Sequence, residues 1–308
     1  MRRQPTRLAG CAISVATATF ALTGCRIDSP VAPAATAERI AATSRQATTS
    51  GRILFRRSLP TAPHVFSMDE DGTDVRMISM AFTAAVDAAW APDGKRILVS
   101  AAMTDPAVPL SVFSLEPDGT GLTRLTIPPA DCSDTDPQAL GKRIVFLRTC
   151  ANASAAIVME ADGTGLTTLV DNVGSQPGPS PKGSELAYSK GGDLWLLDLV
   201  TGTHTRLTNT PTLVESRPAF SPNGKRIAFT QSDGSGFQIF TMDPDGTMIT
   251  HVQANGFGAV WSPDGKRIAF TRLNEITDVF VSNADGTGVT NLTQTPSEFE
   301  TPQAWARF

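Results

Sequence analysis

Side chains suited to binding a cation or a basic partner recur along this chain at intervals of roughly forty residues. They stand just before or at the start of a series of similar strand motifs, at Asp87, Asp134, Asp136, Gln176, Glu215, Arg217, Phe257, Glu298 and Glu300. If those strands converge, the carboxylates would focus negative potential at one point and attract a basic segment. Ca²⁺ also prefers carboxylate oxygens, so Asp87, Asp134, Glu215 and Glu298 are its candidate ligands. The alternative is a solvated rim of loop acids that holds no ligand.

The sequence lacks the motifs that would make these residues an active site. The three histidines, His64, His204 and His251, form neither an HExxH pair nor a cluster, which argues against a transition-metal centre. No GxSxG nucleophile motif occurs. The Asp-Gly turns near Asp69 and Asp243 lack the glycine and glutamate that an EF-hand loop requires, so we interpret them as hairpin turns. The chain is therefore expected to bind rather than to catalyse, with no cofactor beyond the candidate Ca²⁺.

One pattern repeats from residue 51 onwards and determines which elements position these side chains. A tight turn is followed by a strand that begins basic and becomes apolar, as in SPNGKRIAFT from Ser221 and SPDGKRIAFT from Ser262. The turn glycines, which stand 41 to 47 residues apart, are Gly51, Gly94, Gly141, Gly183, Gly224 and Gly265. Proline presets the first central position of such a turn, and glycine takes the left-handed position.

A second pattern follows each first one. It is an apolar strand that runs into an Asp-Gly-Thr turn, as in QIFTMDPDGT and DVFVSNADGT, and a short strand that ends in Leu-Thr comes after it. Each repeat of about 42 residues therefore holds four strands. Such a sheet cannot bury both of its faces alone. Radial stacking against copies of itself does bury them, and this is the β-propeller arrangement.

The two ends of the repeat region predict how the ring closes. The first repeat begins at Gly51, in what is elsewhere the second strand, so it lacks an opening strand. The last repeat is followed by PQAWARF at 302–308, which matches the opening strand that ends at Trp90. We therefore predict an all-β, six-bladed propeller over 51–308. Its blades are four-stranded and antiparallel, and it is closed by pairing of the C-terminal strand with the N-terminal blade.

Two of the four cysteines, Cys132 and Cys150, flank the shortened first hairpin of the third repeat almost symmetrically. Cross-strand neighbours lie close enough for a disulfide, which we expect in an exported chain. The alternative is a pair of reduced, buried thiols.

Residues 1–24 are interpreted as an export signal. Three arginines accompany an uncharged apolar stretch, Leu8 to Leu22, that is too short to span a bilayer comfortably. The stretch leads into Leu-Thr-Gly-Cys at Cys25, which resembles the lipobox of bacterial lipoproteins, and the resemblance implies that a lipid modifies Cys25. Residues 25–50 lack apolar periodicity and are expected to form a flexible tether. Contact with a membrane would then be through this lipid alone.

The motif SPDGKRIAF, followed by the DGT turn, resembles the WD-like propeller repeat of the TolB family. The resemblance covers 51–308 and implies six blades. TolB proteins carry an α/β domain before the propeller, whereas only the tether stands there in this chain. We therefore expect a lipoprotein form that lacks that domain. The resemblance further implies an exported protein, on the periplasmic side of the outer membrane or on the cell surface, that binds a protein or peptide of the cell envelope through one axial face.

The remaining alternatives concern the partner. The formal net charge of −4 argues against nucleic acid, and we expect a monomer. The tryptophans, Trp90, Trp195, Trp261 and Trp305, could offer a platform for sugars, but three of them share one repeat position, which favours packing between blades. A glycan-binding or polysaccharide-lyase-like propeller that uses the acids at 215, 298 and 300 stays open as the second function. The expected first strands contain no histidine, which argues against the lyase. A purely structural role is the third.

Overall fold

The computed structural model describes residues 51–103, 109–151, 153–273, 277–295 and 297–307. The predicted signal peptide, the lipidation site Cys25 and the predicted tether lie outside these ranges. None of the described residues belongs to a helix with the length and hydrophobicity needed to cross a membrane.

The described residues form 24 strands in six sheets of four. The strands are β1 (Gly51–Ser58), β2 (Pro63–Asp69), β3 (Arg76–Met77), β4 (Ala84–Trp90), β5 (Ile97–Ala102), β6 (Ser111–Leu115), β7 (Thr123–Arg124), β8 (Cys132–Leu140), β9 (Arg143–Cys150), β10 (Ala153–Glu160), β11 (Thr167–Asp171), β12 (Gly178–Pro179), β13 (Glu185–Lys190), β14 (Asp193–Asp198), β15 (His204–Arg206), β16 (Val214–Phe220), β17 (Ile227–Ser232), β18 (Phe237–Met242), β19 (Thr250–Ala254), β20 (Gly256–Trp261), β21 (Arg267–Arg272), β22 (Val279–Asn283), β23 (Thr290–Asn291) and β24 (Phe299–Arg307).

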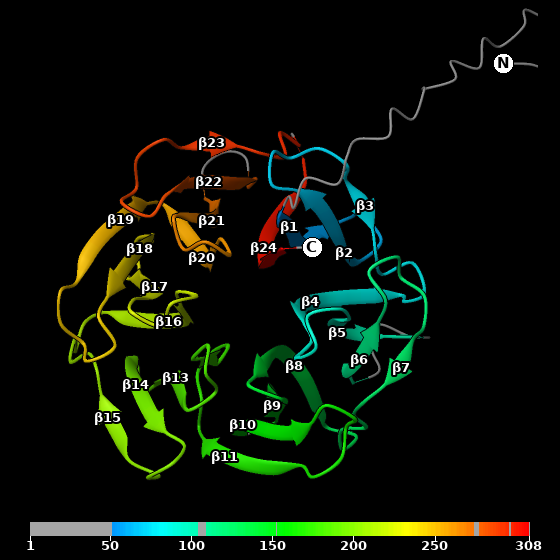
Figure 1. The fold of residues 1–308 in the computed structure, drawn as a ribbon, viewed down its shortest axis with the longest axis horizontal. Helices are drawn as coiled ribbons and strands as arrows, with labels where there is room; N and C mark the ends of the chain where they lie inside the picture. The colour runs from blue at the N-terminus through cyan, green and yellow to red at the C-terminus, as the bar shows by residue number, and fades with distance from the viewer. Residues whose placement is uncertain (1–50, 104–108, 152, 274–276, 296, 308) are drawn as a thin grey trace, which may run out of the picture. The chain divides into compact units, whose positions relative to one another are not determined.

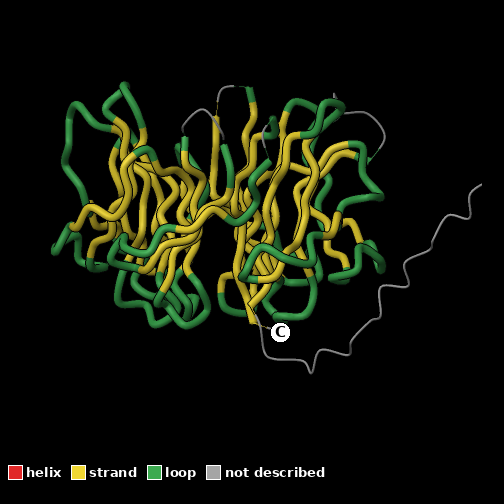
Figure 2. Tube along the Cα trace, turned by 90° about the horizontal axis from the view of Figure 1, so that it is seen from above, coloured by secondary structure: helices red, strands yellow, loops and turns green. Residues whose placement is uncertain are grey.

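Each sheet is an antiparallel blade, and the six blades surround a central axis (Figure 1). The strands nearest the axis are β24, β4, β8, β12, β16 and β20, for blades 1 to 6 in that order. The loops that lead into these inner strands lie on one side of the disc, here called the loop face. The tight turns from each inner strand to the second strand lie on the opposite side, here called the turn face (Figure 2). The prediction of six four-stranded blades is confirmed.

The ring closes where the last strand joins the first blade. β24 pairs antiparallel with β1, with Trp305 opposite Ile53 and Glu300 opposite Arg57. The predicted closure is therefore confirmed, and the first blade gains the inner strand that its own stretch of chain lacks. Strand β24 ends on the turn face, beside the start of β1 (Figure 2).

The Asp-Gly-Thr turns between third and fourth strands share one geometry in five blades. The aspartate Oδ1 accepts hydrogen bonds from the backbone N–H and the hydroxyl of the threonine two residues later, at Asp71, Asp118, Asp162, Asp245 and Asp285. The turn glycine also lies against the preceding blade. A Cβ on Gly163, which has φ +89°, would stand 2.6 Å from the carbonyl oxygen of Leu125. The repeated glycine therefore allows both the left-handed turn and the close contact between blades.

The core fills the spaces between blades. Successive residues of a strand face opposite sides, so Ile53 packs against blade 6 with Trp305, while Leu54 packs against blade 2. The indole N–H of Trp261 donates to the carbonyl oxygen of Ala219 in the preceding blade at 3.0 Å. These tryptophans are packed between blades and do not form an exposed platform.

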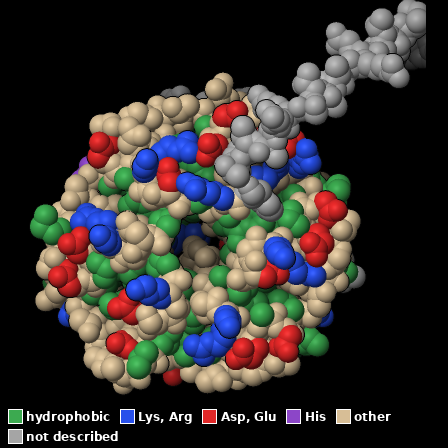
Figure 3. Space-filling model, viewed as in Figure 1, with side chains coloured by type: hydrophobic (Ala, Val, Ile, Leu, Met, Phe, Trp, Pro, Cys, Tyr) green, Lys and Arg blue, Asp and Glu red, His purple; other side chains and the backbone are tan. Residues whose placement is uncertain are grey.

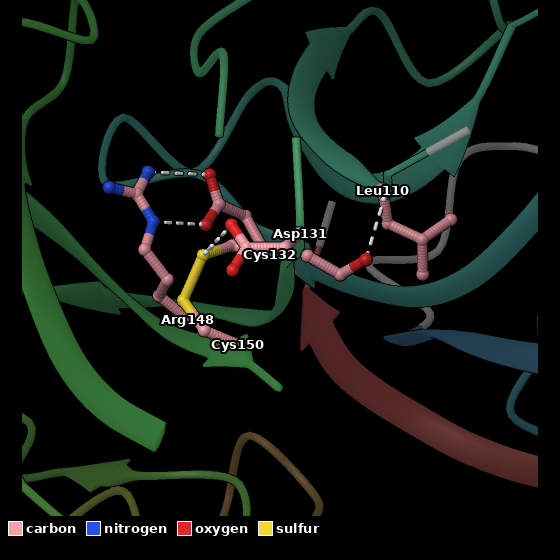
Figure 4. Close-up of a disulfide and its surroundings, with 7 residues drawn as sticks. Leu110, Asp131, Cys132, Arg148 and Cys150 are labelled. Atoms are coloured by element: carbon pink, nitrogen blue, oxygen red, sulfur yellow. Dashed lines mark hydrogen bonds and ion pairs between the residues drawn. A yellow bond between two sulfur atoms is a disulfide. The ribbon is translucent and has the colours of Figure 1, made fainter. Parts of the chain in front are cut away.

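Blade 3 carries a covalent brace. Cys132 and Cys150 stand opposite each other on β8 and β9 and are joined by a disulfide (Figure 4). Beside it, Arg148 donates two hydrogen bonds to the carboxylate of Asp134, at 2.7 and 2.9 Å. Both cross-links tie the inner strand of this blade to its second strand near the loop face.

Candidate functional site

Irregularities in three inner strands position side chains at the axis. The pairing register shifts in β8, β16 and β20, and one residue in each shift has a positive φ: Asp136 at 50°, Arg217 at 52° and Gly258 at 70°. In all three blades the N–H of this residue donates to a side chain of the preceding blade. The acceptors are Asp87 at 3.2 Å, Ser175 at 3.0 Å and Thr230 at 3.2 Å. The shifted residue therefore joins its inner strand to the preceding blade.

Six residues, one from each blade, make up what we call the axial cluster. They are Arg56, Asp87, Asp136, Gln176, Arg217 and Phe257. The Arg217 guanidinium donates to Gln176 Oε1 at 3.1 Å and lies 4.9 Å from the ring centroid of Phe257. Through-space electrostatic interactions couple the two arginines to the two aspartates. The cluster is therefore a polar layer that links all six blades.

Burial controls the ionisation of the two axial carboxyls. It raises the pKa of Asp136 to about 7, with a further upward contribution from the negative charge of Asp87, while Arg217 and Arg56 oppose the shift. Burial also raises the pKa of Asp87. Asp136 Oδ1 is buried without a hydrogen-bond partner, which disfavours its charged form further. The structure thus brings two of the predicted acids together but places two arginines among them.

The other predicted acids are held apart from the axial cluster by partners of their own. Asp134, Glu215 and Glu300 are fully buried. Asp134 is paired with Arg148, and Glu300 accepts from Arg57 Nε at 2.5 Å.

Arg57 also contacts Glu298 at 3.0 Å, and Glu298 keeps 26% of its side chain exposed. Glu215 accepts from Thr208, Thr210 and Gln231 at 2.5 to 3.1 Å. The ion pairs of Asp134 and Glu300 stay within one blade, whereas the hydrogen bonds of Glu215 also reach the residues that follow the outer strand of blade 4.

No set of three or more histidine, cysteine, aspartate or glutamate side chains that could hold a metal ion occurs in the described ranges. The Ca²⁺ site expected from Asp87, Asp134, Glu215 and Glu298 therefore stays a prediction. The histidines stand away from the inner strands. His64 Nδ1 lies 3.0 Å from Ser79 Oγ, His204 Nδ1 lies 2.7 Å from the Tyr188 hydroxyl, and the ring of His251 packs on Phe240.

Sequence reasoning missed three residues of the loop face, namely Arg56, Phe237 and Phe299. Phe237 starts β18 and packs edge-to-face on Phe257, with centroids 5.3 Å apart, and 37% of Phe237 is exposed. Arg56 comes from a second strand, and its guanidinium lies 5.5 Å from the ring centroid of Phe299. Only the first strands were expected to supply site residues. The two adjacent arginines at the end of GRILFRR, Arg56 and Arg57, are the one feature of the sequence that could have indicated this contribution from a second strand.

A channel runs from the axial cluster to the turn face. It has a volume of about 280 Å³. Its lining includes Gln176 and Arg217 from the axial cluster and, at the other end, residues of the tight turns such as Pro181 and Pro222. Figure 3 views the turn face and shows a central hollow bordered by hydrophobic side chains, with basic side chains around it.

Comparison with known proteins agrees with this architecture. A family model of the TolB β-propeller domain matches residues 138–307, which is more than half of the chain. This chain belongs to the TolB β-propeller family. No curated protein matches it by sequence.

Solved structures of TolB-family proteins share its fold. TolB from Acinetobacter baumannii has a TM-score of 0.70 at 17% identity, over 84% of this chain and 67% of that one. The putative TolB from Agrobacterium tumefaciens has a TM-score of 0.62 at 19% identity, over 84% of this chain and 99% of that one. An oligogalacturonate lyase in complex with manganese has a TM-score of 0.55 at 12% identity, over 79% of this chain and 73% of that one. At these identities the likeness concerns the fold alone.

Proposed function

We propose that this TolB-family propeller is a non-catalytic, lipid-anchored protein that binds a protein partner in the bacterial cell envelope through the axial region of its loop face. Lipid attachment at Cys25 is the proposed anchor, and the partner is an envelope protein or peptide. The membrane is contacted through the lipid alone, and the propeller acts as a monomer.

The arrangement around Arg217 is the observation that carries this proposal. Its guanidinium stacks on Phe257, and Phe257 in turn packs on the partly exposed Phe237. Val214, at the start of the same inner strand, is also exposed. Arginine and aromatic side chains dominate the binding energy of protein interfaces, because they combine apolar area with directional polar groups. Membership of the TolB β-propeller family also supports a protein-binding role in general terms.

The alternative is a glycan-binding or lyase-like propeller. It would use Glu215, Glu298 and Glu300 as its acids. Two of these carboxylates, Glu215 and Glu300, are fully buried and hydrogen-bonded to protein groups, and Glu298 contacts Arg57. The structure therefore favours the protein-binding proposal, and glycan binding is the outcome that a glycan array would detect.

Affinity capture tests the proposal. Full-length chain carrying a tag is used to capture proteins from the detergent-solubilised envelope of its own bacterium. We expect a specific partner that is retained by the wild-type chain and lost with Phe237→Ser, because this change removes an exposed aromatic contact without emptying the core.

Val200→Ser is the matched control. Val200 is 84% exposed in a turn between third and fourth strands, on the turn face. This variant should retain the partner. If no envelope protein is captured above background, or if both variants lose the same proteins, the proposed function is wrong.

A further inference from the structure

The tight turns of four successive blades touch one another on the turn face. A Cβ on Gly183 would stand 2.6 Å from the backbone nitrogen of Gly141, so the turns of blades 3 and 4 are in contact. A Cβ on Gly224 would stand 3.8 Å from Cδ of Pro181, so the turns of blades 4 and 5 are also in contact. A Cβ on Gly265 would stand 3.6 Å from Cδ of Pro222, which places the turns of blades 5 and 6 in contact. We call this continuous rim of turns, residues 140–142, 181–183, 222–225 and 263–266, the turn arc.

Each turn of the arc carries one exposed lysine. These are Lys142, Lys182, Lys225 and Lys266. None of the ion pairs between described residues includes a lysine, whereas the arginines that follow two of these turns are paired. Arg226 contacts Asp243 at 2.7 Å, and Arg267 contacts Glu70 at 2.6 Å. The positive charge of this rim that takes part in no ion pair among the described residues therefore belongs to the lysines.

One acidic side chain of the arc itself, Asp264, offsets part of its positive charge. Asp264 accepts hydrogen bonds from the Ser262 hydroxyl and from the backbone N–H of Lys266, and these bonds together with the charges of Arg267 and Lys266 lower the pKa of its carboxyl. The equivalent position in blade 5 is Asn223, which is uncharged and makes the same bond to the N–H of Lys225. Glu185 stands just beyond the turn of blade 4.

The turn arc borders the mouth of the channel, and the walls of the channel combine apolar rings with polar groups. Trp261, Trp305, Phe220, Pro181 and Pro222 line it, and Gln176 with Arg217 stands at its inner end. Its volume of about 280 Å³ is of the size of one or two large side chains. Proline and tryptophan lose little conformational freedom on binding, so the pocket is preorganised.

A second ring, of opposite charge, lies farther from the axis on the same face. The aspartates of the Asp-Gly-Thr turns are exposed there, at Asp71, Asp118, Asp162, Asp245 and Asp285. Figure 3 shows acidic side chains towards the edge of the disc, and others beside the basic side chains nearer its centre. A flat anionic surface, such as a bilayer, would be repelled by the outer ring. A narrow anionic ligand that stays inside that ring meets the four lysines, against one exposed aspartate of the arc, Asp264.

We propose that the turn face is a second binding surface, which takes an acidic peptide segment of a partner protein. The segment inserts an apolar side chain into the channel, and its carboxylates lie on the lysines of the turn arc. This surface is opposite to the loop face, so it adds to the proposed function and does not replace it.

Peptide binding to the purified full-length chain tests this proposal. The probe is a fluorescein-labelled peptide in which glutamates flank one central phenylalanine, and its binding is followed by fluorescence anisotropy. We expect saturable binding that weakens as salt is raised. The double variant Lys182→Glu/Lys225→Glu should weaken binding about tenfold or more, because it reverses two charges at the mouth of the channel.

Lys190→Glu is the control. Lys190 is an exposed lysine at the loop-face end of β13 and makes no ion pair with the described residues, so its reversal should leave binding unchanged. A peptide with serine in place of phenylalanine should bind more weakly, and one with lysines in place of glutamates should not bind. Equal binding by the wild type and the double variant would overturn the proposal. So would tighter binding to vesicles of anionic lipid than to the acidic peptide. The test leaves Phe237 intact, so its failure would not bear on the loop face.

Discussion

Asp136 combines three features that seldom occur together in one residue. It has a left-handed backbone, a buried carboxyl with an unpartnered oxygen, and a pKa raised to about 7. Each of these costs folding free energy near neutral pH. Asp136 belongs to the axial cluster, and this cost to stability accompanies the polar layer that links the six blades.

The first prediction concerns the pH dependence of stability. Because the folded pKa of Asp136 lies above its ordinary value of 3.8, the unfolded chain releases this proton first as the pH rises. Stability is therefore lost between about pH 4 and pH 7. Asp136→Asn cannot ionise, so it should melt about 3–6 °C above the wild type at pH 8, and the advantage should vanish near pH 4.

Asp285→Asn controls for the loss of a charge as such. Asp285 is exposed, and hydrogen bonds from the side chain and backbone of Thr287 lower the pKa of its carboxyl. Its replacement should therefore not raise the melting temperature at pH 8. Calorimetry at each pH measures the melting temperatures of both variants and of the wild type. If Asp136→Asn differs from the wild type by the same number of degrees at every pH, the raised pKa assigned to Asp136 is wrong.

At the scale of elements, contacts between neighbouring blades depend on turn glycines. Gly163 has φ +89°, and a Cβ added to it would stand 2.6 Å from the carbonyl oxygen of Leu125. Gly202 has φ +73°, and a Cβ added to it would have no atom within 4 Å. Gly202 belongs to the variant Thr-Gly turn of blade 4, so the chain contains its own control for the cost of the left-handed conformation.

The second prediction compares these two glycines. Gly202→Ala should cost about 1 kcal/mol in free energy of unfolding, for the backbone conformation alone. Gly163→Ala should cost about 1–3 kcal/mol more, because the blade must also shift away from the added methyl group. Urea unfolding of the two variants measures the difference. Equal costs would show that the contact between blades contributes nothing.

The regular elements could be predicted from sequence because each carries its own signal. The turn glycines and the Asp-Gly-Thr turns mark the same two hairpins in nearly every repeat. The inner strands could not be predicted in detail, because the register shifts at Asp136 and Arg217 place non-glycine residues at positive φ without any local signal. The shifts decide which side chains reach the axis. For the same reason, the prediction found Asp87 and Asp136 but not that Arg56 accompanies them.

At the scale of the whole molecule, one strand pairing closes the ring. Trp305 of β24 packs with Ile53 and with residues of blade 6, and so it joins the last blade to the first. The third prediction follows from this position. Trp305→Ala should lower the free energy of unfolding by about 3–5 kcal/mol, as expected for a buried tryptophan.

The same variant should also speed hydrogen exchange of the β1 amides, because the closure would open locally. Trp195→Ala is the comparison, since Trp195 is only half-buried and lies in a third strand away from the closure. It should destabilise less and leave exchange in β1 unchanged. Equal effects of both changes on β1 would contradict the role assigned to the closure.

The central claim is that partner binding occurs at the axial region of the loop face. Photocrosslinking in intact cells tests it most directly, with a photoreactive residue at Val214, exposed at the start of β16, and another at Thr205, exposed on the outer strand of blade 4. We predict a discrete protein adduct from Val214 and none from Thr205. No adduct at Val214, or the same adduct at both positions, would contradict the account.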